Sequence, residues 1–183
     1  DGENFEFLES TDPSMTGNEG FSNVQEIAIN PNSGAVFAAT LQGVYYSNDQ
    51  GGSWNFARSG ETEFLIGNST DVNIGSNGIT AVSLNGLCYI SEDGNPNTFV
   101  LHSSDTFNLP FEGVGGLEMA IAPSNPDILY ATVLGEEAEL INIYLSEDKG
   151  VNWRIVAPGN SPSLPLVFAL DNNVLAVFPY DPY

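Results

Sequence analysis

The fold is decided by one stretch of sequence that occurs twice, first as Ser47-Asn48-Asp49-Gln50-Gly51-Gly52-Ser53-Trp54 and again as Ser146-Glu147-Asp148-Lys149-Gly150-Val151-Asn152-Trp153. Both copies fit the pattern S-x-D-x-G-x-x-W. Between them lies a degenerate copy that opens with Ser91-Glu92-Asp93-Gly94 and closes on Phe99. We call these stretches the first box (47–54), the second box (91–99) and the third box (146–153). Their first serines are 44 and 55 residues apart, and the shorter spacing is the length of a four-stranded propeller blade.

Short apolar runs surround each box in the same order. They contain three to six residues, are rich in β-branched, aliphatic or aromatic side chains, and are bounded by Gly, Asn, Pro or Asp, which predicts strands joined by tight turns. No window shows a sustained helical period with caps. In chain order the runs are Ala28–Pro31, Val36–Thr40 and Gly43–Ser47; Val72–Ile74, Thr80–Leu84 and Leu87–Ser91; Ala120–Pro123, Ile128–Thr132 and Ile143–Ser146.

This periodicity predicts an all-β protein, a β-propeller of four-stranded antiparallel blades. We expect three whole blades, at residues 20–58, 70–102 and 113–157. Partial blades are expected at both ends, with the last strand of a preceding blade at 1–12 and the start of the next blade at 165–183. Because a propeller has four to eight blades, this is expected to be a segment of a larger ring. Either the rest of a longer protein or another chain would complete that ring. The chain opens on Asp1 without an initiator Met or a signal peptide, so we expect a mature or internal piece.

The boxes resemble the Asp-box, or bacterial neuraminidase repeat, family, and the resemblance covers nearly the whole chain. More closely, the sequence is similar to the sialidase-like and sortilin-like propellers of secreted multidomain proteins of Bacteroidetes, many of which are exported by the type IX system. The runs 118–127 and 174–182 carry that similarity. It implies a secreted or cell-surface location and implies no activity, because one fold serves many functions.

The resemblance implies that the box residues have a structural role. The aspartate is expected to accept backbone hydrogen bonds across the hairpin between the third and fourth strands of a blade, and the glycine to take a backbone conformation that other residues disfavour. The aromatic residue is expected to pack between blades. The predicted structural residues are Ser47, Asp49, Gly51 and Trp54; Ser91, Asp93, Gly94 and Phe99; Ser146, Asp148, Gly150 and Trp153. We assign no catalytic or cofactor-binding residue. We assign no metal-binding residue either, since the ligand spacing of an EF-hand, with its bidentate Glu, is absent.

The charge of the chain is extreme. The chain has 24 acidic residues and only three basic ones, Arg58, Lys149 and Arg154, which gives a formal net charge of -21. Nucleic acid, which requires basic residues, is therefore excluded as a partner, and anionic membrane surfaces are disfavoured. The acidity indicates a solvated surface, with attraction of divalent cations such as calcium as a second interpretation. No run approaches the length of a membrane helix, and Cys88, the single cysteine, is expected to be a buried thiol.

Enzymatic interpretations find little support. Sialidases of this repeat class grip a carboxylate with three arginines, whereas this chain has only two. A xyloglucan-cleaving glycosidase needs only a carboxylate pair, but nothing selects one, and Glu136, Glu137 and Glu139 are expected in an exposed loop. His102 stands alone and is expected in a surface or turn position.

The sequence therefore favours a non-catalytic extracellular scaffold or recognition module, such as part of an adhesin or a surface filament, with a protein or glycan partner. The alternative is the propeller part of a glycan-active enzyme. An intracellular assembly factor of the photosystem type is a third, less favoured, interpretation.

Overall fold

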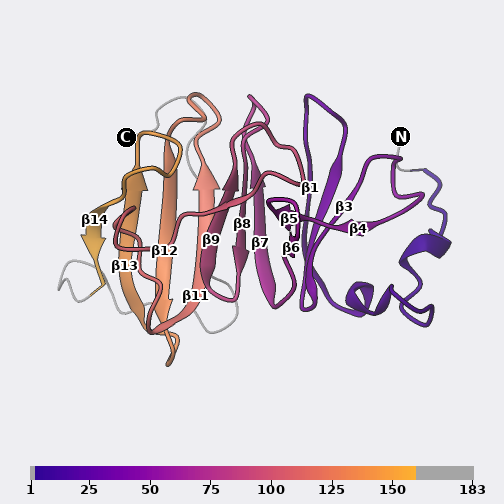
Figure 1. Ribbon diagram of the computed structural model, residues 1–183, viewed down its shortest axis with the longest axis horizontal. Helices are drawn as coiled ribbons and strands as arrows, with labels where there is room; N and C mark the ends of the chain where they lie inside the picture. Colours follow the sequence, from indigo (N-terminus) through magenta and orange to yellow (C-terminus); the bar gives the residue numbers. More distant parts are fainter. Residues whose placement is uncertain (1–2, 160–183) are drawn as a thin grey trace.

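The computed structural model describes residues 3–159, and three four-stranded antiparallel sheets dominate it. The sheets follow one another in chain order and stand side by side in a row (Figure 1). The first sheet contains β1 (Val24–Ile29), β2 (Val36–Thr40), β3 (Gly43–Ser47) and β4 (Asn55–Phe56); the second contains β7 (Ser69–Ile74), β8 (Thr80–Leu84), β9 (Leu87–Ser91) and β10 (Val100–Leu101); the third contains β11 (Val114–Ile121), β12 (Leu129–Gly135), β13 (Leu140–Ser146) and β14 (Arg154–Pro158). Each sheet is a simple meander in which consecutive strands pair.

The first strands of the three sheets lie next to one another, as the innermost strands of propeller blades do. Strand β7 contacts β1 on one side and β11 on the other. We call β1, β7 and β11 the inner strands. Each carries a shift of pairing register near its start, at Val24/Glu26, Ser69/Asp71 and Val114/Gly116. Such bulges increase the local twist, and their repetition supports three equivalent blades.

The core lies between the sheets, because a blade cannot bury its two faces alone. The first interface joins Phe37 and Val44 of the first sheet to Val72 and Val82 of the second, and includes Phe99. The second interface joins side chains of β8 and β9 to those of β11, β12 and β13; its members include Ile79, Cys88, Met119, Leu129 and Trp153. Cys88 is fully buried, as the sequence predicts.

Residues 3–12 differ from the expectation. They form an extended segment followed by a 3-10 turn, η1 (Glu9–Thr11), and contain no strand, although the last strand of a preceding blade was predicted at 1–12. A strand needs a paired neighbour, and this segment pairs with none of the described strands. It crosses the first box instead, with the Ser10 hydroxyl donating to the Gly51 carbonyl. The predicted blade start at 165–183 lies outside the described residues.

Two smaller elements complete the structure. The turn η2 (Glu19–Ser22) leads into β1, and a short hairpin of β5 (Arg58–Ser59) and β6 (Glu63–Phe64) connects the first sheet to the second. Within residues 3–159, no helix has the length and hydropathy that a membrane crossing requires.

Candidate functional site

The first and third boxes have the same hydrogen-bond pattern. In the first, the Ser47 hydroxyl donates to Oδ1 of Asp49 at 2.7 Å and accepts from the Gly51 amide at 2.8 Å. Oδ1 of Asp49 also accepts from the Ser53 amide at 2.8 Å. In the third, the same three bonds join Ser146, Asp148, Gly150 and Asn152 at 2.9, 2.8 and 2.8 Å. Each box therefore closes its hairpin through its own side chains.

The second box reaches a similar result with different donors. Asp93 accepts from the Ser91 hydroxyl at 3.0 Å, the Asn95 amide at 3.0 Å and the Thr98 hydroxyl at 2.7 Å. Its glycine, Gly94, has a φ of +67°, which favours glycine over any other residue. The turn thus tolerates loss of the S-x-D-x-G-x-x-W spacing, because the Asn95 amide and the Thr98 hydroxyl donate to Asp93 in place of the amide four residues after the aspartate.

The three box aromatics occupy different environments. Phe99 and Trp153 are 1% and 4% exposed and lie in the first and second interfaces between sheets. Trp54 is only half-buried and contacts Phe21 of η2, with ring centroids 5.0 Å apart. The difference arises because no described sheet precedes the first one.

The lowered pKa values of two box acids do not suit the role of a general acid. Hydrogen bonds from Ser47 and Ser53 lower the pKa of Asp49 to about 2, and those from Thr98 and Asn95 lower the pKa of Asp93. A general acid at neutral pH requires a raised pKa instead. These carboxylates are ionised acceptors whose lone pairs are used by their own turns.

A second set of acids, which the sequence analysis missed, lies on the inner strands. Glu26, Asp71 and Glu118 occupy the same register position in their blades, opposite Ala39, Ser83 and Thr132 respectively. The signal is visible in the sequence, since each acid stands three residues before an isoleucine: Ile29, Ile74 and Ile121. We call these three residues the inner acids.

The inner acids connect neighbouring blades. Oε2 of Glu26 accepts from the Val72 amide at 3.0 Å, and Oδ2 of Asp71 accepts from the Met119 amide at 2.6 Å. In both cases the donor is the residue that follows the acid of the next blade. We call this repeated bond the clasp. Asn73 supports the second clasp by donating to Oδ1 of Asp71 at 2.6 Å and to the Met119 carbonyl at 3.0 Å.

The inner acids also perturb one another. Burial, a hydrogen bond with the Glu26 carboxyl and the charges of Glu118 and Glu26 raise the pKa of Asp71 well above its usual value. Burial, with a smaller contribution from the charge of Glu26, raises the pKa of Glu118 to about 7. Like charges in a buried site favour retention of a proton. The cluster therefore resembles the carboxyl groups of an acid–base site in its electrostatics, although its lone pairs bind backbone amides.

His102 is placed differently from the expectation of a surface or turn residue. It directly follows β10 and is only 6% exposed. Its Nδ1 lies 2.7 Å from the Gly150 carbonyl oxygen, which requires the tautomer protonated at Nδ1, and its ring stacks on Phe107 at 4.6 Å. Burial lowers its pKa. The residue joins the second sheet to the third box, and its partners lie too far along the chain for local sequence to reveal.

The remaining candidates are peripheral. Glu136, Glu137 and Glu139 are exposed in the turn between β12 and β13. Arg154 lies in the outermost strand of the third sheet and bonds Glu147 at 3.2 Å. In residues 3–159, no three His, Cys, Asp or Glu side chains are arranged to hold a metal ion.

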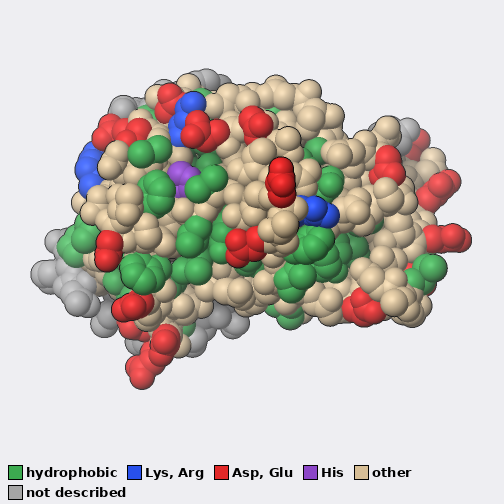
Figure 2. Space-filling model, in the orientation of Figure 1, with side chains coloured by type: hydrophobic (Ala, Val, Ile, Leu, Met, Phe, Trp, Pro, Cys, Tyr) green, Lys and Arg blue, Asp and Glu red, His purple; other side chains and the backbone are tan. Residues whose placement is uncertain are grey.

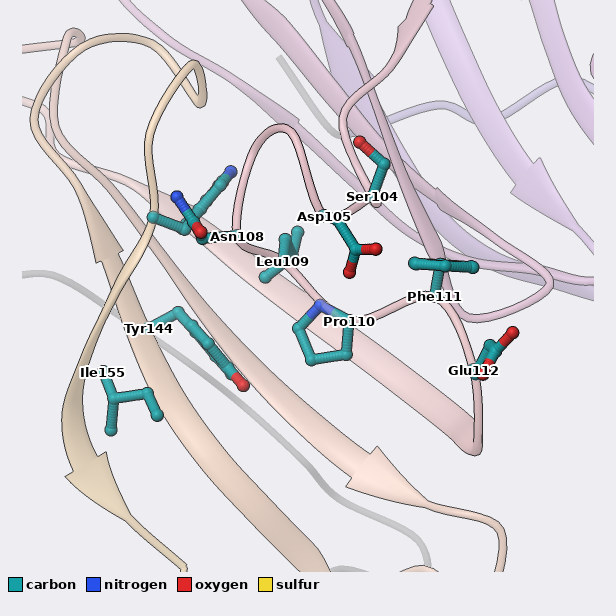
Figure 3. Close-up of a pocket in the computed structure, with 10 residues that line it drawn as sticks. Ser104, Asp105, Asn108, Leu109, Pro110, Phe111, Glu112, Tyr144 and Ile155 are labelled. Carbon is teal, nitrogen blue, oxygen red and sulfur yellow. The ribbon is translucent and has the colours of Figure 1, made fainter.

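An open groove of about 810 Å³ lies between the loop that precedes β11 and the outer strands of the third sheet. Tyr144 and Ile155 line one side and point toward Pro110, while Asp105 and Phe111 lie across from them (Figure 3). Phe111 and Ile155 are 44% and 52% exposed. Apolar side chains in a concave surface with a few polar groups are typical of a recognition site. We call this surface the Phe111 groove.

No protein-family model and no curated protein matches the sequence. Among solved structures, this chain is similar to an ancestral GH74 enzyme, with a TM-score of 0.54 and 17% identity over 73% of this chain and 18% of the other. It is also similar to a GH74 enzyme of Niastella koreensis, with a TM-score of 0.47 and 22% identity over 70% of this chain and 17% of the other. A third similar structure is PorZ, an essential bacterial surface component of the type-IX secretion system of Porphyromonas gingivalis. Its TM-score is 0.44, with 14% identity over 74% of this chain and 16% of the other.

The first of these similarities establishes the fold and nothing further. Together with the three sheets, it shows that the chain forms part of a β-propeller, as the sequence predicts. The chain spans less than a fifth of the length of each of these three structures.

Proposed function

We propose that this stretch is a non-catalytic scaffold and recognition module of an extracellular, cell-surface propeller of Asp-box type. The use of its distinctive acids supports this proposal. Oxygens of Asp49, Asp93 and Asp148 accept hydrogen bonds within their boxes, and Glu26 and Asp71 accept backbone amides of the next blade. Acids engaged in this way hold the fold together.

The Phe111 groove is the recognition surface that we propose, with a glycan or a protein segment as its partner. Its aromatic and aliphatic floor offers area for stacking, and Asp105 and Glu112 contribute carboxylates at its rim. Acidic side chains are also spread over the face shown in Figure 2, where basic ones are few. Nucleic acid and direct membrane insertion stay excluded in this proposal on charge and hydropathy. The extracellular location rests on the sequence resemblance.

A glycan-active enzyme is the second candidate, and one observation favours it. The raised pKa of Glu118 beside two further carboxyls is what a glycosidase needs in its general acid. Against it, the side chains that line the Phe111 groove and the groove at Ile27 do not include the inner acids.

One set of measurements separates the two candidates. The purified chain is tested against a panel of soluble glycans for binding by calorimetry and for hydrolysis by release of reducing ends. A recognition module binds without release, and Phe111→Ala weakens that binding while Phe64→Ala does not. Phe64 is a matched control because it is also 44% exposed and lies outside the groove. Hydrolysis that Glu118→Gln abolishes would establish the enzyme instead.

A further inference from the structure

The face of the first sheet that points away from the second sheet is apolar and uncovered over its inner half. Ile27 and Ile29 of β1 are 59% and 62% exposed. With Val24 they form what we call the β1 face. The exposure of two isoleucines on one short strand is unfavourable in free energy, because apolar side-chain area stays in contact with water.

The other two blades show what this surface is built to contact. Val72 and Met119 have the register position of Ile27, since all three pair with the third residue of the second strand: Ala38, Val82 and Ala131. Val72 is 1% exposed and Met119 is 2% exposed. Each is buried against the second and third strands of the preceding blade. The same position is therefore covered wherever the structure describes a preceding blade.

The clasp indicates that a partner of the β1 face also needs a polar group, an acceptor for a backbone amide. The amides of Val72 and Met119 each donate to an inner acid of the preceding blade, at 3.0 and 2.6 Å. The Ile27 amide holds the equivalent place on β1. A preceding blade with an acid at the position of Glu26 would reach it in the same way.

The N-terminal segment covers only the outer half of this side. Phe21 packs on Tyr45 and Trp54 with ring centroids 4.9 and 5.0 Å apart, and Phe7 and Leu8 lie nearby. A groove of about 440 Å³ separates this segment from β1, with Val24 and Ile27 in its wall. The segment thus leaves the inner strand free for a partner.

We propose that the β1 face docks a further propeller blade of the same polypeptide, whose inner strand carries an Asp or Glu that clasps the Ile27 amide and whose second and third strands bury Ile27 and Ile29. Both junctions in the structure are made in this way by consecutive blades of one chain, so the proposed contact continues an interface already described. It rests on the propeller fold and not on the recognition function, and the two can fail separately.

Hydrogen exchange at the Ile27 amide tests the proposal. It is measured by NMR or by mass spectrometry in the protein at its full encoded length, over a range of concentrations. We expect protection of roughly 100-fold or more, similar to that of the Val72 and Met119 amides and independent of concentration. Exchange at the rate of an open strand edge would overturn the proposal. Protection that grows with concentration would also overturn it, because a second copy would then be the occupant.

Substitution at the same face provides a second readout. Ile27→Lys should lower the melting temperature of the full-length protein far more than Ile66→Lys, since Ile66 is 56% exposed and lies outside the β1 face. Equal effects of the two substitutions would contradict a docked blade. The exchange measurement on the unchanged protein stands even if the Ile27 variant fails to fold.

Discussion

Replacing Glu118 with glutamine should make the protein less sensitive to pH in a defined window. Burial and the charge of Glu26 raise the pKa of this carboxyl from 4.5 to about 7 in the folded state. Below about pH 4.5 the group is protonated whether the chain is folded or unfolded, so its shifted pKa does not change the free energy of unfolding. As pH rises toward 7, the unfolded chain releases the proton while the folded protein retains it, and stability falls until both are ionised.

The magnitude follows from the size of the shift. If fully expressed, it corresponds to roughly 3 kcal/mol. Glu118 is only partly buried, and solvent screening reduces the effect to about 1–2 kcal/mol. For a chain of this size that is a change in melting temperature of roughly 2–8 °C. The neutral amide in Glu118→Gln should remove this loss and retain a polar partner for Thr70, which bonds Glu118 in the folded protein.

The assay is urea unfolding at several pH values, followed by tryptophan fluorescence. We expect the advantage of Glu118→Gln over the unchanged protein to grow by about 1–2 kcal/mol between pH 4.5 and 7.5. Comparing the two proteins removes the opposing contribution of His102, whose lowered pKa adds stability as pH rises. Glu112→Gln, at an exposed carboxylate, is the matched control. An advantage that does not change with pH would refute the burial of Glu118 next to Glu26.

Four further outcomes are expected. Trp153→Ala should cost about 3–5 kcal/mol in urea unfolding, as for other buried aromatics, and clearly more than the half-buried Trp54→Ala; equal costs would contradict the second interface. Asp148→Ala should cost about 1 kcal/mol and speed proteolysis at the third box, because the Asn152 amide loses its acceptor. Removal of calcium with EDTA should leave the melting temperature unchanged, and a fall would reveal a cation site. Cys88 should react with a thiol reagent only on unfolding, because burial raises its pKa; rapid labelling of the native protein would contradict its burial.

The sequence predicted the propeller because its signals are local. A hairpin that closes through its own serine, aspartate and glycine is specified by eight consecutive residues, as in the first and third boxes. The strands on either side have short apolar runs that fit a pleated, half-buried surface. Such features can be recognised without knowing what packs against them.

The parts that were missed depend on contacts between distant residues. His102 is buried because the Gly150 carbonyl, 48 positions away, accepts from its ring. Residues 3–12 lack the strand that was expected because a strand needs a partner, which the segment itself does not reveal. The inner acids could have been found from their common distance to Ile29, Ile74 and Ile121, but comparison of the apolar residues alone passes over them.

The inner acids resolve a conflict that the propeller creates. Each inner strand is the edge of its sheet and presents amides that no strand pairs, which would invite association with other chains. A carboxylate from the neighbouring blade satisfies such an amide at Val72 and again at Met119. Burial of these acids is costly, and retention of protons lowers that cost. An acid that clasps a backbone amide and shares a proton has little freedom to grip a substrate, so the cluster with the most perturbed carboxyls favours a structural role, and recognition is better sought at the Phe111 groove.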